Sequence, residues 1–270
     1  MKFRLYIVLI ILVLLTSCGG FEKLLKSSDF ELKKTKAIEY YNDGQYVKTT
    51  ELLAQILPRY RATEEAEDLN WMNAQAFYGM KDFYMAGTYF KSFNEQFPFG
   101  KHAEEGNFMA AMSDYKIAPR SELDQDNSKN GIENFNIFIT KFPNSTKVDE
   151  AKKLEKELEE RLVEKSYLSA RLYYDMKEYK ASVVALNNSL KAYTNSKYRE
   201  EMLFLKLNSL YLYADKSQAI KQKERYQATL DDYYSFMEEF PKSKFSRDVN
   251  NIYQKTNKFL KAGTHDSGVK

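Results

Sequence analysis

The stretch FYMAGTYFKSFNEQFPFG, residues 83–100, contains the pattern on which the fold depends. Phe83 lies fifteen residues before Pro98, and the small residue Ala86 lies twelve residues before it. Proline cannot continue a helix, and the residue before a proline leaves the α-helical region. The stretch is therefore predicted to be a helix that ends near Phe97. Its small residue allows a second helix to cross closely, and its aromatic residues fill the remaining space.

The same order of aromatic residue, small residue and helix end recurs along the chain. It is found in Tyr179, Ser182 and Thr194, and again in Tyr226, Thr229 and Pro241. A fixed recurring pattern predicts a repeat protein, and this one is typical of the second helix of a tetratricopeptide repeat. The predicted fold class is all-α, a superhelical solenoid of about five elongated tetratricopeptide helix pairs with a C-terminal capping helix.

The predicted repeats are longer than the roughly 34-residue standard. The first has the clearest turn between its helices, Asn42-Asp43-Gly44-Gln45-Tyr46, but its expected end at Leu57-Pro58 comes three residues early. The third has extra residues between its helices, and the fourth has extra helical turns. The repeats are expected at residues 33–61, 67–100, 102–145, 148–196 and 198–244, followed by a capping helix at about 245–260.

The N-terminus has the layout of a secretory signal peptide. Lys2 and Arg4 precede an apolar run over residues 5–15, and Leu15-Thr16-Ser17-Cys18 follows. The apolar run is too short for the roughly 20 residues of a transmembrane helix. This segment can be read as a lipoprotein signal, as an ordinary cleaved signal or as a buried N-terminal helix.

The end of this segment is similar to bacterial lipoprotein signals, in which the cysteine thiol receives a diacylglycerol and cleavage occurs just before it. Cys18 is the predicted lipidation site, and as the only cysteine it forms no internal disulfide. The predicted domains are a removed signal peptide (1–17), a lipid-anchored tether (18–32), the solenoid (33–260) and a disordered tail (261–270).

The sequence gives no sign of catalytic chemistry. His102 and His265 are the only histidines and have no metal-ligand spacing, so no metal site, cofactor or catalytic residue is predicted. Cleavage before Cys18 removes two of 41 basic residues and leaves 39 against 38 acidic ones, a formal charge of +1. With no basic stripe, nucleic-acid binding is not expected. The chain is predicted not to be an enzyme.

Several segments, in this order after Cys18, resemble the BamD family of outer-membrane assembly lipoproteins. They are residues 103–109, 123–126, 132–145, Arg161-Leu162, 170–174 and 179–181. The chain departs from that family at four positions: Gly131, Ser166, Ser182 and Thr194. These departures leave the fold in place but weaken the transfer of partner contacts there.

The resemblance implies a lipid-anchored scaffold on the periplasmic face of the outer membrane. Its partners would be the periplasmic domains of the β-barrel assembly protein, bound mainly by the C-terminal repeats, and other assembly lipoproteins. Its N-terminal repeats would receive unfolded outer-membrane proteins, through a peptide-binding groove whose residues the sequence does not identify.

The alternative to the assembly role is that the chain is a different tetratricopeptide lipoprotein of the cell envelope, which serves envelope maintenance or glycan capture. Glycan capture needs exposed aromatic platforms, and Trp71, the one tryptophan, is expected to be packed.

Overall fold

The computed structural model describes residues 18–265, and every regular element in that range is an α-helix. The predicted signal peptide, residues 1–17, lies outside the described residues. Five helix pairs follow a short first helix, and a single helix follows the last pair. The helices are α2 (Cys18–Lys26), α3 (Phe30–Asn42), α4 (Tyr46–Tyr60), α5 (Ala66–Gly79), α6 (Phe83–Gln96), α7 (Ala103–Ile117), α8 (Asp126–Lys141), α9 (Val148–Asp175), α10 (Tyr179–Ala192), α11 (Arg199–Asp215), α12 (Ala219–Glu239) and α13 (Ser246–His265).

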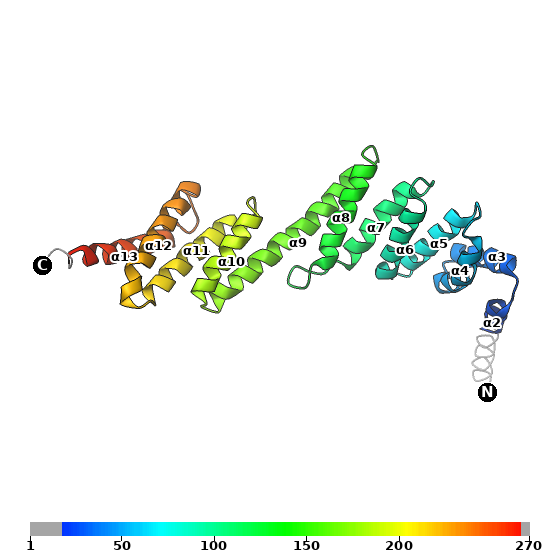
Figure 1. The fold of residues 1–270 in the computed structure, drawn as a ribbon, viewed down its shortest axis with the longest axis horizontal. Helices are drawn as coiled ribbons and strands as arrows, with labels where there is room; N and C mark the ends of the chain where they lie inside the picture. Colours follow the sequence, from blue (N-terminus) through cyan, green and yellow to red (C-terminus); the bar gives the residue numbers. More distant parts are fainter. Residues whose placement is uncertain (1–17, 266–270) are drawn as a thin grey trace, which may run out of the picture. The chain divides into compact units, whose positions relative to one another are not determined.

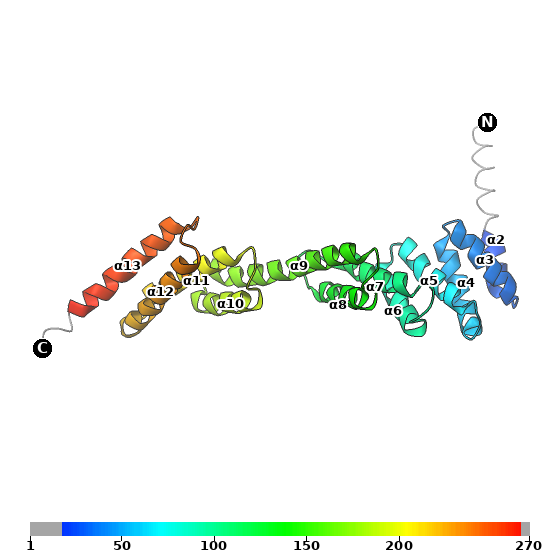
Figure 2. The ribbon, with the colours of Figure 1, turned by 90° about the horizontal axis from the view of Figure 1, so that it is seen from above.

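These helix pairs confirm the predicted all-α tetratricopeptide fold class. The chain divides into two compact bodies. The N-terminal body contains the described residues up to 119 together with 126–158, and the C-terminal body contains 120–125 and the described residues from 159 onward. Within the N-terminal body, α5, α6, α7 and α8 follow one another side by side (Figure 1). Within the C-terminal body, α13 packs against α12 and α11 (Figure 2).

The structure differs from the sequence expectation at three places. The expected tether over 18–32 contains helix α2, whose Phe21, Leu24 and Leu25 pack against the first helix pair. Helix α4 continues through Pro58 to Tyr60, because Tyr60 is buried and its hydroxyl donates a hydrogen bond to Glu31. Helix α13 extends to His265, five residues beyond the expected capping helix, and residues 266–270 of the expected tail are not described.

The small residues of the repeat pattern lie where helices cross. Ala86, Ser182 and Thr229 are all fully buried, as is Thr49 of the first pair. Ser182 shares a 3.0 Å hydrogen bond with the buried Ser209 hydroxyl of α11. A small polar side chain is tolerated here because it finds a buried partner.

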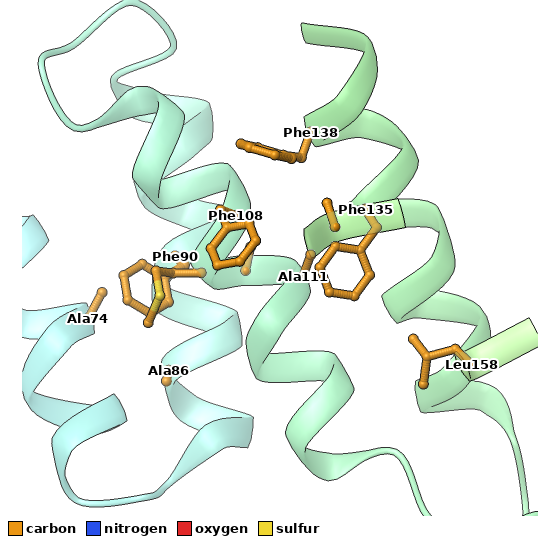
Figure 3. Close-up of a cluster of buried hydrophobic side chains, with 11 residues drawn as sticks. Ala74, Ala86, Phe90, Phe108, Ala111, Phe135, Phe138 and Leu158 are labelled. Atoms are coloured by element: carbon orange, nitrogen blue, oxygen red, sulfur yellow. The ribbon is translucent and has the colours of Figure 1, made fainter. Parts of the chain in front are cut away.

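Large side chains fill the spaces beside these small residues. In the N-terminal body, Phe90, Phe108, Phe135 and Phe138 come together from three successive helices (Figure 3). The Phe108 and Phe138 rings meet edge to face, with centroids 5.3 Å apart. Further clusters surround Leu52, Leu53 and Ile56 in the first pair, and Met202, Leu207 and Phe236 in the C-terminal body.

Gly131 shows how tightly one of these crossings is packed. A Cβ atom at this position would lie 2.6 Å from Cδ1 of Leu158, which is fully buried on α9. The absence of a side chain at Gly131 therefore makes room for Leu158.

Three of the turns that join the two helices of a pair have the same backbone conformation. Each contains one residue in the left-handed region: Gly44 with φ 71°, Lys81 with φ 63° and Lys177 with φ 64°. In the first turn the Gly44 amide donates to the Tyr41 carbonyl at 3.0 Å, and the Gln45 amide donates to the Tyr40 carbonyl at 2.8 Å. The other two turns repeat both bonds. This turn satisfies carbonyl groups that the end of a helix leaves without partners.

The left-handed residue of these turns predicts stability changes of opposite sign for substitutions at Gly44 and at the equivalent Lys81. Gly44→Ala should destabilise the protein by about 1–2 kcal/mol, whereas Lys81→Gly should stabilise it by about 0.5–1 kcal/mol, because only glycine occupies this region without a steric penalty. A Cβ atom on Gly44 would meet no atom within 4 Å, so the backbone alone causes the effect. Urea unfolding measures both changes, and two shifts in the same direction would contradict this account.

Candidate functional site

The N-terminal body contains a pocket of about 450 Å³ between α4 and α6, with α5 as its floor. This volume lies within the range of small-ligand and peptide-side-chain sites. Helix α4 contributes the largest number of lining residues. The lining residues are Thr50, Glu51, Ala54, Leu57, Pro58, Arg61, Asn70, Asn73, Phe77, Tyr89 and Gln96.

One wall of the pocket is aromatic. The rings of Phe77 on α5 and Tyr89 on α6 stack with centroids 4.7 Å apart and an angle of 14° between their planes. Both side chains are half-buried, so the pair keeps an edge accessible from the pocket. This wall can hold an apolar or aromatic side chain of a ligand.

The floor of the pocket carries an amide that the protein does not use. Asn73 is only 3% exposed, yet among residues 18–265 its side chain has no hydrogen-bond partner. Its amide atoms are not among the solvent-shielded side-chain atoms that lack a partner, so they face the open pocket. By contrast, the neighbouring Asn70 amide donates to the Ala66 carbonyl at 2.8 Å. Asn73 can therefore offer one donor and one acceptor to a ligand.

The next helices show why the pocket forms here. Helices α6 and α7 repeat α4 and α5 with an offset of 37 residues, so Lys91 corresponds to Ala54 and Asp114 to Phe77. Lys91 forms a 2.9 Å ion pair with the buried Asp114 carboxylate. Asp114 also accepts a 2.6 Å hydrogen bond from Asn134 of α8. Asn134 lies eight residues before Phe142, as Tyr89 of α6 lies eight residues before Phe97, so these two positions are equivalent.

The two equivalent sites thus differ in three side chains. Lysine, aspartate and asparagine join α6, α7 and α8 through polar contacts. Alanine, phenylalanine and tyrosine at the preceding site make no such bridge. The short side chain of Ala54 does not reach across, and the space beside it remains open.

The rim of the pocket is polar and carries one cation. Arg61, at the end of α4, is exposed and forms no ion pair within the part of the chain that the structure describes. A second hollow of about 400 Å³, lined by Arg61, Gln96 and Phe97, shares two residues with the pocket. Phe99, two residues further along, is 98% exposed. The site therefore combines an amide, an aromatic wall and a guanidinium, which are groups that recognise a polypeptide.

The C-terminal body has a different candidate surface at the end of α9. Leu172, Tyr173 and Met176 are large, exposed side chains, and Met176 is 60% exposed. Leu172 and Tyr173 lie in the last turn of α9, and Met176 directly follows the helix, where its amide donates to the Leu172 carbonyl at 2.9 Å. We call these three residues the α9 ridge. Adjacent exposed apolar side chains are a feature of protein-interaction sites.

Trp71 is packed, as the sequence predicts. Its indole stacks on the His102 ring with centroids 4.7 Å apart and planes 3° from parallel, and the rings of Phe90 and Phe93 also contact it. His102 is held by Asp68, whose carboxylate lies 3.3 Å from its ring nitrogen. The Lys101 ammonium, together with His102, holds the pKa of Asp68 below its usual value. This arrangement leaves no open tryptophan platform for a sugar ring.

The predicted lipidation site, Cys18, is the first residue of α2. Within residues 18–265 no group of three or more His, Cys, Asp or Glu side chains is placed to hold a metal ion. A search of the same range finds no helix with the length and apolar character needed to cross a membrane.

The sequence alone does not mark any of the lining residues as part of a pocket. Asn73, Phe77 and Tyr89 read as ordinary helix positions when each repeat is considered alone. The useful signal is the difference between equivalent positions 37 residues apart, where Ala54 and Phe77 replace the ion pair of Lys91 and Asp114.

Comparison with known proteins identifies one family. The YfiO family, described as outer membrane lipoprotein, matches residues 33–222. No curated protein matches the chain. A solved structure of the TPR2AB-domain:pHSP90 complex of yeast Sti1 aligns with 14% identity and a TM-score of 0.37, over 85% of this chain and 99% of that one. At this similarity nothing about ligands is transferred from that structure.

The packing of Trp71 gives a prediction about glycan binding. Soluble cell-wall oligosaccharides should leave the Trp71 fluorescence unchanged, because aromatic rings already cover the indole. His102→Ala is the control, since removing the stacked ring should shift the emission and show that it reports on local contacts. A saturable change in the unaltered protein on adding oligosaccharide would contradict the prediction.

Proposed function

The chain belongs to the YfiO family of outer-membrane lipoproteins, and we propose on this basis that it is a non-catalytic scaffold of the machinery that assembles β-barrel proteins in the outer membrane. Lipid on Cys18 would hold it at the periplasmic face. Two acyl chains or more give stable attachment, whereas a single chain gives only marginal binding. The family match over residues 33–222 is the observation that carries the proposal.

The pocket suits an unfolded barrel polypeptide as its ligand. Such a chain is extended, with free main-chain amides and with side chains that alternate between its two faces. The Asn73 amide can pair with one main-chain N–H and C=O, in place of the water that they lose. An apolar side chain of the ligand can pack on Phe77 and Tyr89, and exposed Phe99 adds apolar surface near the same site. We assign receipt of clients to this pocket.

The α9 ridge suits a folded partner. Its three large side chains are exposed at the C-terminal end of α9, so a partner can cover them without unfolding any part of the scaffold. We assign binding of the periplasmic domains of the barrel assembly protein to this ridge and the C-terminal helices around it. Clients and the assembly protein then bind to separate bodies of the chain.

Affinity capture tests the proposal as a whole. The native protein is captured from membranes solubilised in mild detergent, and the accompanying proteins are identified. The barrel assembly protein should be the main partner. Recovery of only cell-wall or division proteins would overturn the assembly role and favour the alternative of cell-envelope maintenance.

Replacing the pocket residues by those of the neighbouring site should abolish client binding. The triple variant Ala54→Lys, Phe77→Asp, Tyr89→Asn copies Lys91, Asp114 and Asn134, a set already accommodated in the same fold. Affinity for unfolded outer-membrane proteins should fall by roughly tenfold or more, which corresponds to about 1.4 kcal/mol of lost binding. Fluorescence anisotropy of labelled client measures the change.

Tyr84→Asn is the matched control for this variant. Tyr84 lies on the same helix as Tyr89 but is 68% exposed and lies outside the pocket. Its replacement should leave client affinity within about twofold, a free-energy change below about 0.5 kcal/mol. Equal losses from Tyr84→Asn and the folded triple variant would remove the pocket from the proposal.

Charges on the α9 ridge should separate the two binding functions. Leu172→Glu with Met176→Glu should weaken capture of the assembly protein, because a carboxylate must lose its hydration to enter an apolar contact. Client affinity should not change. Ile220→Glu, at an 87% exposed site on α12 of the same body, is the control and should bind normally. Normal capture by the double variant would exclude the ridge as the docking site.

A further inference from the structure

Helix α2 is folded onto the N-terminal body. Its Phe21, Leu24 and Leu25 are half-buried against the cluster that contains Leu52, Leu53 and Ile56, and both views place α2 beside the first helix pair (Figures 1 and 2). The Phe21 ring meets Tyr40 edge to face with centroids 5.6 Å apart. The apolar face of α2 is therefore already occupied by the protein.

A buried lysine fastens the end of this helix. Lys33 on α3 is 3% exposed, and its ammonium donates to the Leu25 carbonyl at 3.0 Å and to the side-chain oxygen of Gln55 on α4. The Leu25 carbonyl is one of the last in α2 and has no partner within its own helix. A buried ammonium is unfavourable unless it is paired, so Lys33 favours the arrangement in which α2 stays docked.

The predicted lipid is attached to the docked helix itself, because Cys18 is the first residue of α2. Only Gly19 and Gly20 lie between Cys18 and Phe21. Consecutive Cα atoms are 3.8 Å apart, so the Cα atoms of Cys18 and Phe21 can be separated by at most about 11 Å. A lipid on Cys18 thus cannot reach the bilayer unless the first helix pair comes close to it as well.

The free face of α2 carries two lysines and one glutamate, Glu22, and so has a net positive charge. Lys23 and Lys26 are exposed and three residues apart, which places them on the same side of the helix. Lys48 lies near the start of α2, with its ammonium 5.6 Å from the centre of the Phe21 ring. Basic side chains beside an acyl chain are attracted to the phosphate groups of lipids.

We propose that α2 is a rigid bracket that holds the N-terminal body directly against the phosphate head groups of the membrane, with Lys23 and Lys26 facing them. The inference rests on the lipidation of Cys18 in the proposed function. It adds a fixed orientation, because a helix packed on the body and fastened by Lys33 does not act as a loose tether. The pocket, in the same body, is then held at a defined height above the membrane.

Fluorescence quenching by lipid tests the bracket. The full-length protein is acylated and matured in bacteria and reconstituted into vesicles of phosphatidylethanolamine and phosphatidylglycerol that contain a head-group quencher. Acylation consumes the Cys18 sulfur, so Val47→Cys provides the only thiol for a dye. Val47 is 59% exposed and directly precedes Lys48. Lys141→Cys, at the exposed end of α8 in the same body, is the control.

The dye at residue 47 should be quenched several-fold more strongly than the dye at residue 141. Adding Lys33→Met should reduce this difference, because the released helix no longer fixes the body. Charge reversal at Lys23→Glu and Lys26→Glu should reduce it too, and these exposed substitutions leave the packing intact, which keeps the test valid if Lys33→Met fails to fold.

Mass spectrometry of the mature N-terminus separates the two proposals. Equal quenching of the two dyes in a protein that carries acyl chains would overturn the bracket alone. Quenching that is insensitive to both the Lys33 and the Lys23/Lys26 substitutions would also overturn it. A mature protein without acyl chains would overturn the lipid anchor of the proposed function, and the bracket with it.

Discussion

The contact between a large side chain on one helix and a small, fully buried residue on the helix that crosses it is the interaction on which the structure depends. Gly106 on α7 lies against the Phe93 ring of α6, and Gly131 on α8 lies against Leu158 of α9. Each contact joins helices that are close in sequence, so the core is a series of local clusters. In such an array stability is approximately a sum of repeat and nearest-neighbour terms.

This local construction leaves each repeat free to differ at the positions between successive second helices. One site is bridged by Lys91, Asp114 and Asn134, and the preceding site is left open by Ala54, Phe77 and Tyr89. Changing three side chains therefore alters a binding surface without altering the packing of the helices. The Asn73 amide in the open site makes no hydrogen bond to another described residue, so it is free to pair with a ligand.

The sequence predicts the helix pairs because their signals are local. Prolines, the turn glycine at Gly44 and the spacing of small and aromatic residues all act within one repeat. Helix α2 was not predicted, since Gly19 and Gly20 argue against a helix, and the burial of Phe21, Leu24 and Leu25 that overrides them is a tertiary effect. The pocket was not predicted for a similar reason, because it depends on which residues face each other across three helices.

Native-state hydrogen exchange tests the central claim, that the core is a series of local clusters, most directly. The account predicts that rising denaturant opens the amides of the described residues in groups that follow the clusters around Leu53, Phe90 and Leu207, each with its own free energy. It also predicts measurable protection in α2, next to the first of these clusters. One common opening free energy for all the helices would contradict it, because that result requires a single cooperative core.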